Sequence, residues 1–230
     1  MKTIGLIGGI SWESSAHYYQ IINREVQRRL GGVNSCKCLM YSVNFAEIEA
    51  LQRAGDWETL AQIMADAGRR LKNGGADLLL ICANTMHKVA DAVEIAAGLP
   101  VLHIADIVAA QMKKSGFNTA GLLGTRYTME GGFYSGRLKE MHGIAAIVPD
   151  EADRQAVHDI IFKELVIGQI NPSSKARLLA IIQKLGHMGA EGIILGCTEL
   201  PMLVGQEDCE IPIYDTTYLH AMAGVDYALQ

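Results

Sequence analysis

A long-range internal repeat constrains the fold of this chain more than any other sequence feature. Three pairs of segments resemble each other in the same order: 4–8 with 120–124, 76–85 with 190–199, and 99–102 with 211–214. Their offsets are 116, 114 and 112 residues, and the middle pair places Ala83 on Cys197. Matches at nearly constant distance indicate that the chain consists of two related halves.

Short apolar runs alternate with amphipathic stretches in both halves. The runs predict strands at 3–7, 38–43, 76–82, 101–104, 119–123, 144–148, 192–195 and 211–214, and the stretches between them predict helices. This order is typical of an α/β fold, so we expect two similar doubly wound parallel-sheet domains related by pseudo-twofold symmetry. The first would comprise residues 1–105 plus 211–230 and the second 106–210, with the active-site cleft between them.

The most informative strand end is the one that carries Cys197. The run 192–195 is followed by Gly196, Cys197 and Thr198, and Pro201 suits the first turn of a helix that Thr198 caps. A thiol at a helix N-terminus has a lowered pKa, which favours the thiolate. We therefore expect Cys197 to titrate below the usual value for a cysteine and to react faster than the other four cysteines. The alternative is a small buried hydrophobic residue.

Two motifs at the equivalent strand ends resemble a known family. They read Cys-Ala-Asn-Thr-Met-His at 82–87 and Gly-Cys-Thr-Glu-Leu at 196–200, and the chain opens with Gly-Leu-Ile-Gly-Gly at 5–9. Together they resemble the aspartate/glutamate racemases, the cofactor-independent amino-acid racemases, and are most similar to the L-aspartate/glutamate-specific branch. In that family the residue before Asn-Thr is one catalytic acid/base, usually Cys and in some members Thr. Here that position is Ala83.

The resemblance implies a PLP-independent two-base racemase of aspartate or glutamate, without cofactor or metal, that assembles as a homodimer. Cys197 would be one acid/base, and Ala83 would mark the missing second one, which would impair activity. The residues expected to bind substrate are Ile10, Gln52, Asn84, Thr85, Thr125, Thr128, Lys163, Thr198 and Glu199. Among them, Asn84, Thr85 and Thr198 are donors suited to the substrate's α-carboxylate. Cys82 would point to the opposite side of its strand from Ala83.

Composition narrows the remaining classes of partner. The net charge is −5 and no cluster of Lys and Arg appears, which argues against nucleic acid as a partner. The five cysteines have neither metal-ligand nor disulfide-framework spacing, which is typical of reduced thiols in the cytoplasm. No signal peptide or membrane span is expected. Two other functions fit the sequence: a binding-only protein for small carboxylates, and a related enzyme such as a hydantoin racemase or a one-thiol decarboxylase.

Overall fold

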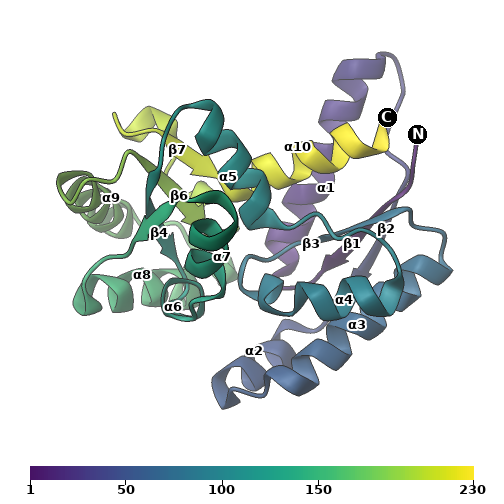
Figure 1. Ribbon diagram of the computed structural model, residues 1–230, viewed down its shortest axis with the longest axis horizontal. Helices are drawn as coiled ribbons and strands as arrows, with labels where there is room; N and C mark the ends of the chain where they lie inside the picture. The colour runs from purple at the N-terminus through teal and green to yellow at the C-terminus, as the bar shows by residue number, and fades with distance from the viewer. The chain divides into compact units, whose positions relative to one another are not determined.

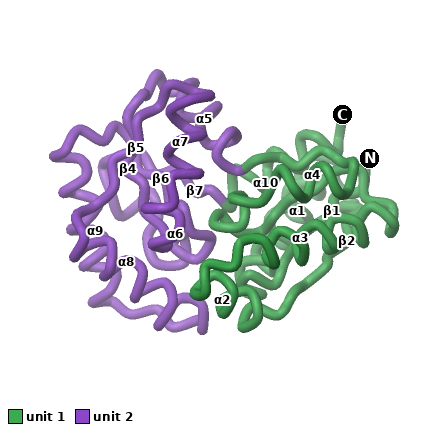
Figure 2. Tube along the Cα trace, turned by 60° about the horizontal axis from the view of Figure 1, so that its bottom comes forward, with its two compact units in different colours: residues 1–103, 217–230 green, residues 104–216 purple.

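The computed structural model describes residues 1–230, and they form two compact units (Figures 1 and 2). Unit 1 contains residues 1–103 and 217–230, and unit 2 contains residues 104–216. Each unit is a parallel sheet with helices packed against it, so the predicted α/β fold with two parallel-sheet domains is confirmed. The relation of the two units by a pseudo-twofold axis stays a prediction.

Unit 1 is built on a three-stranded sheet with the order β2-β1-β3. The strands are β1 (Ile4–Gly8), β2 (Cys38–Ser42) and β3 (Leu78–Ile81). Its helices are α1 (Trp12–Leu30), α2 (Phe45–Ala54), α3 (Trp57–Asn73), the 3₁₀ turn η1 (Thr85–Val89), α4 (Ala90–Ala97) and α10 (Thr216–Ala228). Alternate strand residues serve two cores: Ile7, Leu79 and Ile81 pack with α2, α3 and α4, whereas Leu6 and Leu80 pack with α1 and α10.

Unit 2 is built on a four-stranded sheet with the order β5-β4-β6-β7. The strands are β4 (Thr119–Gly124), β5 (Ala145–Ile147), β6 (Gly192–Gly196) and β7 (Ile213–Asp215). Its helical elements are α5 (Ile104–Lys114), α6 (Arg126–Glu130), α7 (Phe133–His142), α8 (Glu151–Lys163), η2 (Leu165–Ile167), α9 (Pro172–His187), η3 (Leu200–Met202) and η4 (Gln206–Asp208). One core contains Leu123, Ile193 and Leu195 with residues of α8 and α9.

The strand registers reproduce the sequence repeat residue by residue. In unit 1, Gly5 pairs with Leu79, which bridges to Val101; in unit 2, Gly121 pairs with Ile193, which pairs with Ile213. The equivalent residues Gly5 and Gly121, Leu79 and Ile193, and Val101 and Ile213 are 116, 114 and 112 positions apart, which are the offsets of the sequence repeat. A Cβ on Gly5 would lie 2.7 Å from Leu79 Cδ2, and one on Gly121 would lie 2.6 Å from Ile193 Cδ1. The same steric reason therefore places glycine at the centre of both sheets.

The chain crosses between the units at equivalent points of the repeat, and this corrects the predicted boundaries. Residues 211–214 were expected in the first domain, but β7 hydrogen bonds to β6 and belongs to unit 2. The second crossing comes only after Thr216, where α10 joins the core of unit 1. The first crossing, after His103, sends α5 into unit 2 in the same way. The last helix of each repeat thus packs in the other unit.

Two further observations bear on the functions considered above. None of the helices is both long enough and apolar enough to cross a membrane. No group of three or more His, Cys, Asp or Glu side chains is arranged to hold a metal ion.

Candidate active site

In unit 2, the carboxyl ends of β4 and β6 lie side by side because glycines let the backbones approach. A Cβ on Gly124 would lie 2.7 Å from the carbonyl oxygen of Gly196, and one on Gly196 would lie 2.8 Å from that of Leu123. The two strands are neighbours in register at this point. The loops that follow them, which begin at Thr125 and Cys197, therefore leave the same edge of the sheet, where ligands bind in doubly wound folds.

Cys197 follows β6 directly and faces a carboxylate. Its side chain is 6% exposed, and its Sγ donates a hydrogen bond to Glu199 Oε2 over 2.9 Å. Thr198 Oγ1 donates to the same oxygen over 3.0 Å. Thr198 and Glu199 are also buried. The predicted residues Cys197, Thr198 and Glu199 thus form one hydrogen-bonded group at the strand end.

The expectation of a lowered pKa for Cys197 is wrong. Burial, and then the negative charge of Glu199, raise the pKa of Cys197 well above its usual value. The predicted helix dipole is missing, because the segment after Cys197 is only the three-residue turn η3, which starts at Leu200. Thr198 does not cap it either, since its hydroxyl binds Glu199. Cys197 is therefore a neutral thiol that holds its proton.

Thr125 and Thr128 are positioned by the start of α6. Thr125 is the N-cap residue of this helix, and its Oγ1 accepts a hydrogen bond from the backbone N–H of Thr128 over 3.3 Å. The two hydroxyl oxygens are also 3.3 Å apart. Both side chains are buried, so the cap fixes two hydroxyls at the carboxyl end of β4.

In unit 1, Ala83 occupies the position equivalent to Cys197. Its methyl group is 5% exposed and packs in the core that contains Ile10 and Ile48, whereas Cys82 points into the opposite core, as strand alternation predicts. Complete burial raises the pKa of Cys82 far above its usual value. Cys82 is therefore a packing residue, and its geometry does not make it a substitute base.

His87 holds the backbone at Ala83. Its Nδ1 lies 2.9 Å from the carbonyl oxygen of Ala83, so this nitrogen donates the hydrogen bond. The ring centroid is 4.8 Å from that of His103 and 5.3 Å from that of His220, and all three histidines are buried. The sequence permits two interpretations of His87, a group that supports the site or a surface or capping residue, and its burial argues against the surface position. His103 and His220 carry no sequence signal, because 103 and 220 lie far from 87 along the chain.

His220 ties α10 to the rest of unit 1. Its Nε2 donates to the carbonyl of Leu102 over 2.7 Å, which leaves Nδ1 to accept from the hydroxyl of Tyr18 over 2.8 Å. Complete burial, and then the neighbouring His87, lower the pKa of His220 from 6.5 to about 3. The histidine cluster behind Ala83 therefore contains a ring held neutral at physiological pH.

The other expected site residues fall into two groups. Asn84 and Thr85 follow Ala83 and are buried, and Gln52 is buried with its Nε2 3.2 Å from Met86 Sδ, so these residues gather around the strand end of unit 1 together with Ile10. Lys163, at the end of α8, is 72% exposed, and its ammonium binds Asp159 over 3.0 Å. The structure does not bring Lys163 to the group formed by Cys197, Thr198 and Glu199.

The fold and these groups define a class of protein: a duplicated α/β protein with polar groups gathered at equivalent carboxyl ends of its two parallel sheets. The model of the Asp/Glu/hydantoin racemase family matches residues 7–224. The chain belongs to this family.

Individual relatives agree with this assignment over the whole chain. A candidate Asp/Glu racemase from Yersinia pestis is 54% identical with a TM-score of 0.93, and an aspartate racemase homologue from Pyrococcus horikoshii is 34% identical with a TM-score of 0.84. In both comparisons all of each chain is covered. RacX, a broad-specificity amino-acid racemase from Bacillus subtilis, is 24% identical over 226 residues, which cover 93% of this chain and 92% of that protein.

Proposed function

We propose that this chain binds aspartate or glutamate and exchanges the α-proton from one face, with Cys197 as its acid/base and Ala83 at the position of the second one. The observation that carries the proposal is the register match: the strand ends at Ala83 and Cys197 are equivalent, yet only one of them has a group that transfers protons. Family membership supports a racemase. Two-base chemistry also requires both strand ends to serve one substrate, and this remains a prediction.

The surroundings of Cys197 suit a proton donor. Glu199 disfavours a thiolate 2.9 Å away, so the resting group is a thiol that can protonate a carbanion at the substrate's α-carbon. For the reverse step, the positive α-ammonium of the substrate would offset the charge of Glu199 and make the thiolate accessible. Donors at Asn84 and Thr85 would hold the α-carboxylate, and Thr198 would join them by turning its hydroxyl away from Glu199. No step needs a cofactor in this scheme.

The test is hydrogen exchange at the α-carbon. The chain is incubated with each enantiomer of aspartate and glutamate in deuterated buffer, the α-proton is followed by NMR, and the enantiomers are separated by chiral chromatography. We expect one enantiomer to exchange with retention of configuration, and the exchange rate to rise with pH because the base is a thiolate with a raised pKa. Cys197→Ser should remove the exchange. Exchange that survives this substitution would refute the role of Cys197.

A one-thiol decarboxylase is a second candidate, favoured because Cys197 is a neutral thiol and the equivalent position of the repeat, Ala83, has no acid/base group. In that reaction a disubstituted malonate loses CO₂, and the electron pair left on carbon takes the proton of Cys197. The pH dependence separates the two functions, since protonation by the thiol does not accelerate as the pH rises. Ligand-induced stabilisation without either reaction would instead indicate a binding-only protein. Location in the cytoplasm, expected from the cysteine pattern, and assembly as a homodimer, expected from the family resemblance, stay predictions.

A further inference from the structure

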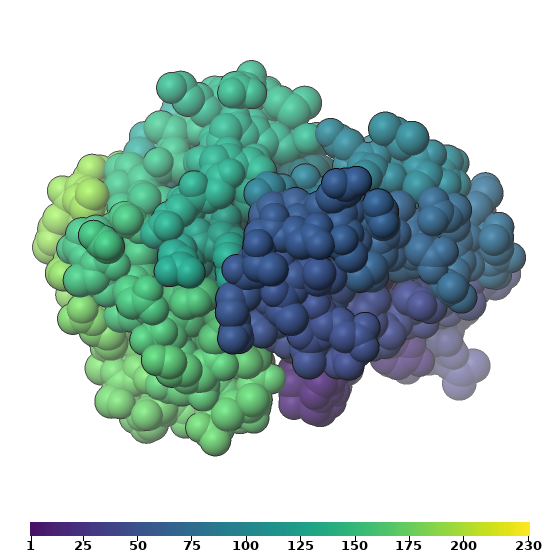
Figure 3. All heavy atoms as spheres, turned by 90° about the horizontal axis from the view of Figure 1, so that it is seen from below, coloured from purple at the N-terminus to yellow at the C-terminus, as the bar shows by residue number.

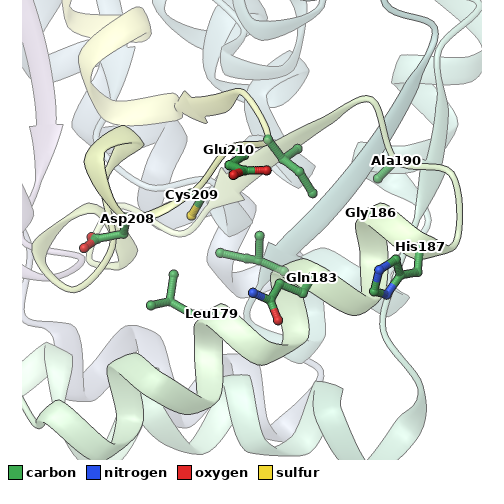
Figure 4. A pocket seen from close by; sticks show the side chains of 10 residues that line it. Leu179, Gln183, Gly186, His187, Ala190, Asp208, Cys209 and Glu210 are labelled. Atoms are coloured by element: carbon green, nitrogen blue, oxygen red, sulfur yellow. The ribbon is translucent and has the colours of Figure 1, made fainter.

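A cavity lies within unit 2, at the opposite end of β6 from Cys197. Its volume is about 760 Å³, which is in the range of small-molecule sites, and it lies between α9 and the segment 208–211 (Figure 4). Ala190 and Ile211 line it just before β6 and β7 begin. Since β6 is five residues long, Cys197 is roughly 16 Å away along the strand. The cavity is therefore separate from the candidate active site.

The segment that covers this cavity is braced by its own side chains. Gln206 Nε2 donates to the carbonyl oxygens of Cys209 and Ile211 over 3.0 and 3.3 Å, and Gln206 Oε1 accepts from the backbone N–H of Ile213 over 2.8 Å. Asp208 pairs with Lys175 of α9 over 2.7 Å. These bonds hold the segment in place over α9.

The floor of the cavity is apolar, and a glycine shapes one end of it. Leu179, Ile182 and Ala190 line the floor together with Ile211. Ile211 reaches α9 because residue 186 has no side chain: a Cβ on Gly186 would collide with Cδ1 of Ile211. The result is a wall of aliphatic carbon suited to an apolar ligand body.

One of the two carboxylates that line the cavity has no ion-pair partner. Glu210 lines the cavity and forms no ion pair, whereas the charge of Asp208 is balanced by Lys175. The cavity also reaches His187, where the 16-residue helix α9 ends, and a helix C-terminus favours positive charge. Figure 4 shows Gln183 and His187 on the helix side and Cys209 and Glu210 on the segment side. Burial and its acidic neighbours raise the pKa of Cys209, so its thiol adds no charge.

We propose that this cavity binds a small amphipathic cation. The apolar body lies on Leu179 and Ile211, and a protonated primary amine lies against Glu210 at the C-terminal end of α9. The site is distinct from the one that Cys197 belongs to, so the proposal does not depend on the proposed function.

The test uses the full chain and 2-phenylethylamine as the probe, with phenylacetate as a matched compound of opposite charge. Binding is measured by calorimetry and by chemical shifts of the amides of α9 and residues 205–212. We expect the amine to bind and phenylacetate to bind at least tenfold more weakly. Glu210→Gln should lower the affinity for the amine about five- to tenfold, as expected for the loss of a charge-assisted hydrogen bond.

Glu207→Gln is the matched control, because Glu207 is another acidic residue of the same segment that forms no ion pair and does not line the cavity. It should leave the affinity for the amine unchanged. Ile211→Ala removes part of the apolar wall and should also lower the affinity for the amine. Equal binding of amine and phenylacetate, equal effects of the two glutamate substitutions, or shifts confined to residues outside the cavity would each overturn the proposal.

Discussion

The strand ends at Cys197 and at Ala83 are equivalent in the repeat, but their side chains differ in chemistry. Cys197 is followed by Thr198 and the buried carboxylate of Glu199, which accepts hydrogen bonds from both. Ala83 is followed by Asn84 and Thr85, and its carbonyl is held by His87. The offset of 114 residues places Thr85 at the position of Glu199. One end is therefore an acidic group with a proton to give, and the other is a set of neutral polar groups around a methyl.

The buried histidines also differ between the units. All three buried histidines, His87, His103 and His220, lie in unit 1. Buried carboxylates paired with cations occur in both units: Glu25 with Arg28 and Arg29 in unit 1, and Asp153 with Arg177 and Lys184 in unit 2. The buried histidines therefore distinguish unit 1 from unit 2, whereas the buried carboxylates do not.

The largest expected effect comes from making the two strand ends alike. Ala83→Thr should add inversion to the one-sided exchange, with a gain of about 10²–10⁴-fold, because a second acid/base then serves the opposite face. Ala83→Cys should do the same. Ala83→Val is the matched control, since valine has the shape of threonine without the hydroxyl. Racemisation is followed by chiral chromatography; a gain with valine, or none with threonine and cysteine, would contradict the equivalence of the two positions.

The next comparison concerns the central glycines. Gly5→Ala and Gly121→Ala each place a Cβ within 2.7 Å of a neighbouring strand's side chain, so each should destabilise its unit by about 1–3 kcal/mol. Urea unfolding of both variants measures the cost, and hydrogen exchange shows which unit opens. Similar losses of unfolding free energy in the two variants, each in its own unit, would support the structural equivalence of Gly5 and Gly121. A large loss of stability in one variant and none in the other would contradict that equivalence.

Acid should destabilise unit 1 more than unit 2. The pKa of His220 is lowered from 6.5 to about 3, so its contribution to stability is complete above pH 6.5 and is lost as the pH falls toward 3. At pH 5 protonation of His220 in the unfolded state should have lowered the free energy of unfolding of unit 1 by about 2 kcal/mol. Hydrogen exchange at pH 7 and pH 5 should show weakened protection in α10 and α1 first. His220→Gln should flatten this dependence, and preferential loss of protection in unit 2 would contradict the prediction.

The smallest expected effect concerns the charge beside Cys197. Glu199→Gln removes the anion that raises the pKa of the thiol, so that pKa should fall and alkylation of Cys197 at neutral pH should accelerate several-fold. The pKa should remain above the usual value for a cysteine, because burial is the larger cause. Thiolate absorbance during a pH titration measures the shift. Glu207→Gln, far from Cys197 along the chain, is the control, and an unchanged or slower reaction in Glu199→Gln would contradict the assigned cause.

Much of the fold could be predicted, and the errors have specific physical origins. The repeat predicted two similar parallel sheets, and the equivalent pairings of Gly5 with Leu79 and of Gly121 with Ile193 agree with this prediction. The assignment of residues 211–214 to the first domain was wrong because β7 pairs with β6 of unit 2, just as the equivalent segment at Val101 bridges to β3 of unit 1. The low pKa expected for Cys197 was wrong because the helix behind it is only a three-residue turn.

The sequence by itself determined the duplicated α/β architecture, the equivalence of Ala83 and Cys197, and membership in a racemase family, since all three depend on local patterns and on motifs that stay together along the chain. Only the tertiary structure decided the state of Cys197, the burial of His87 against His103 and His220, and the exposure of Lys163. Those properties depend on which distant groups meet and how far water is excluded. Residues 87 and 220, or 175 and 208, become neighbours only when strands and helices pack.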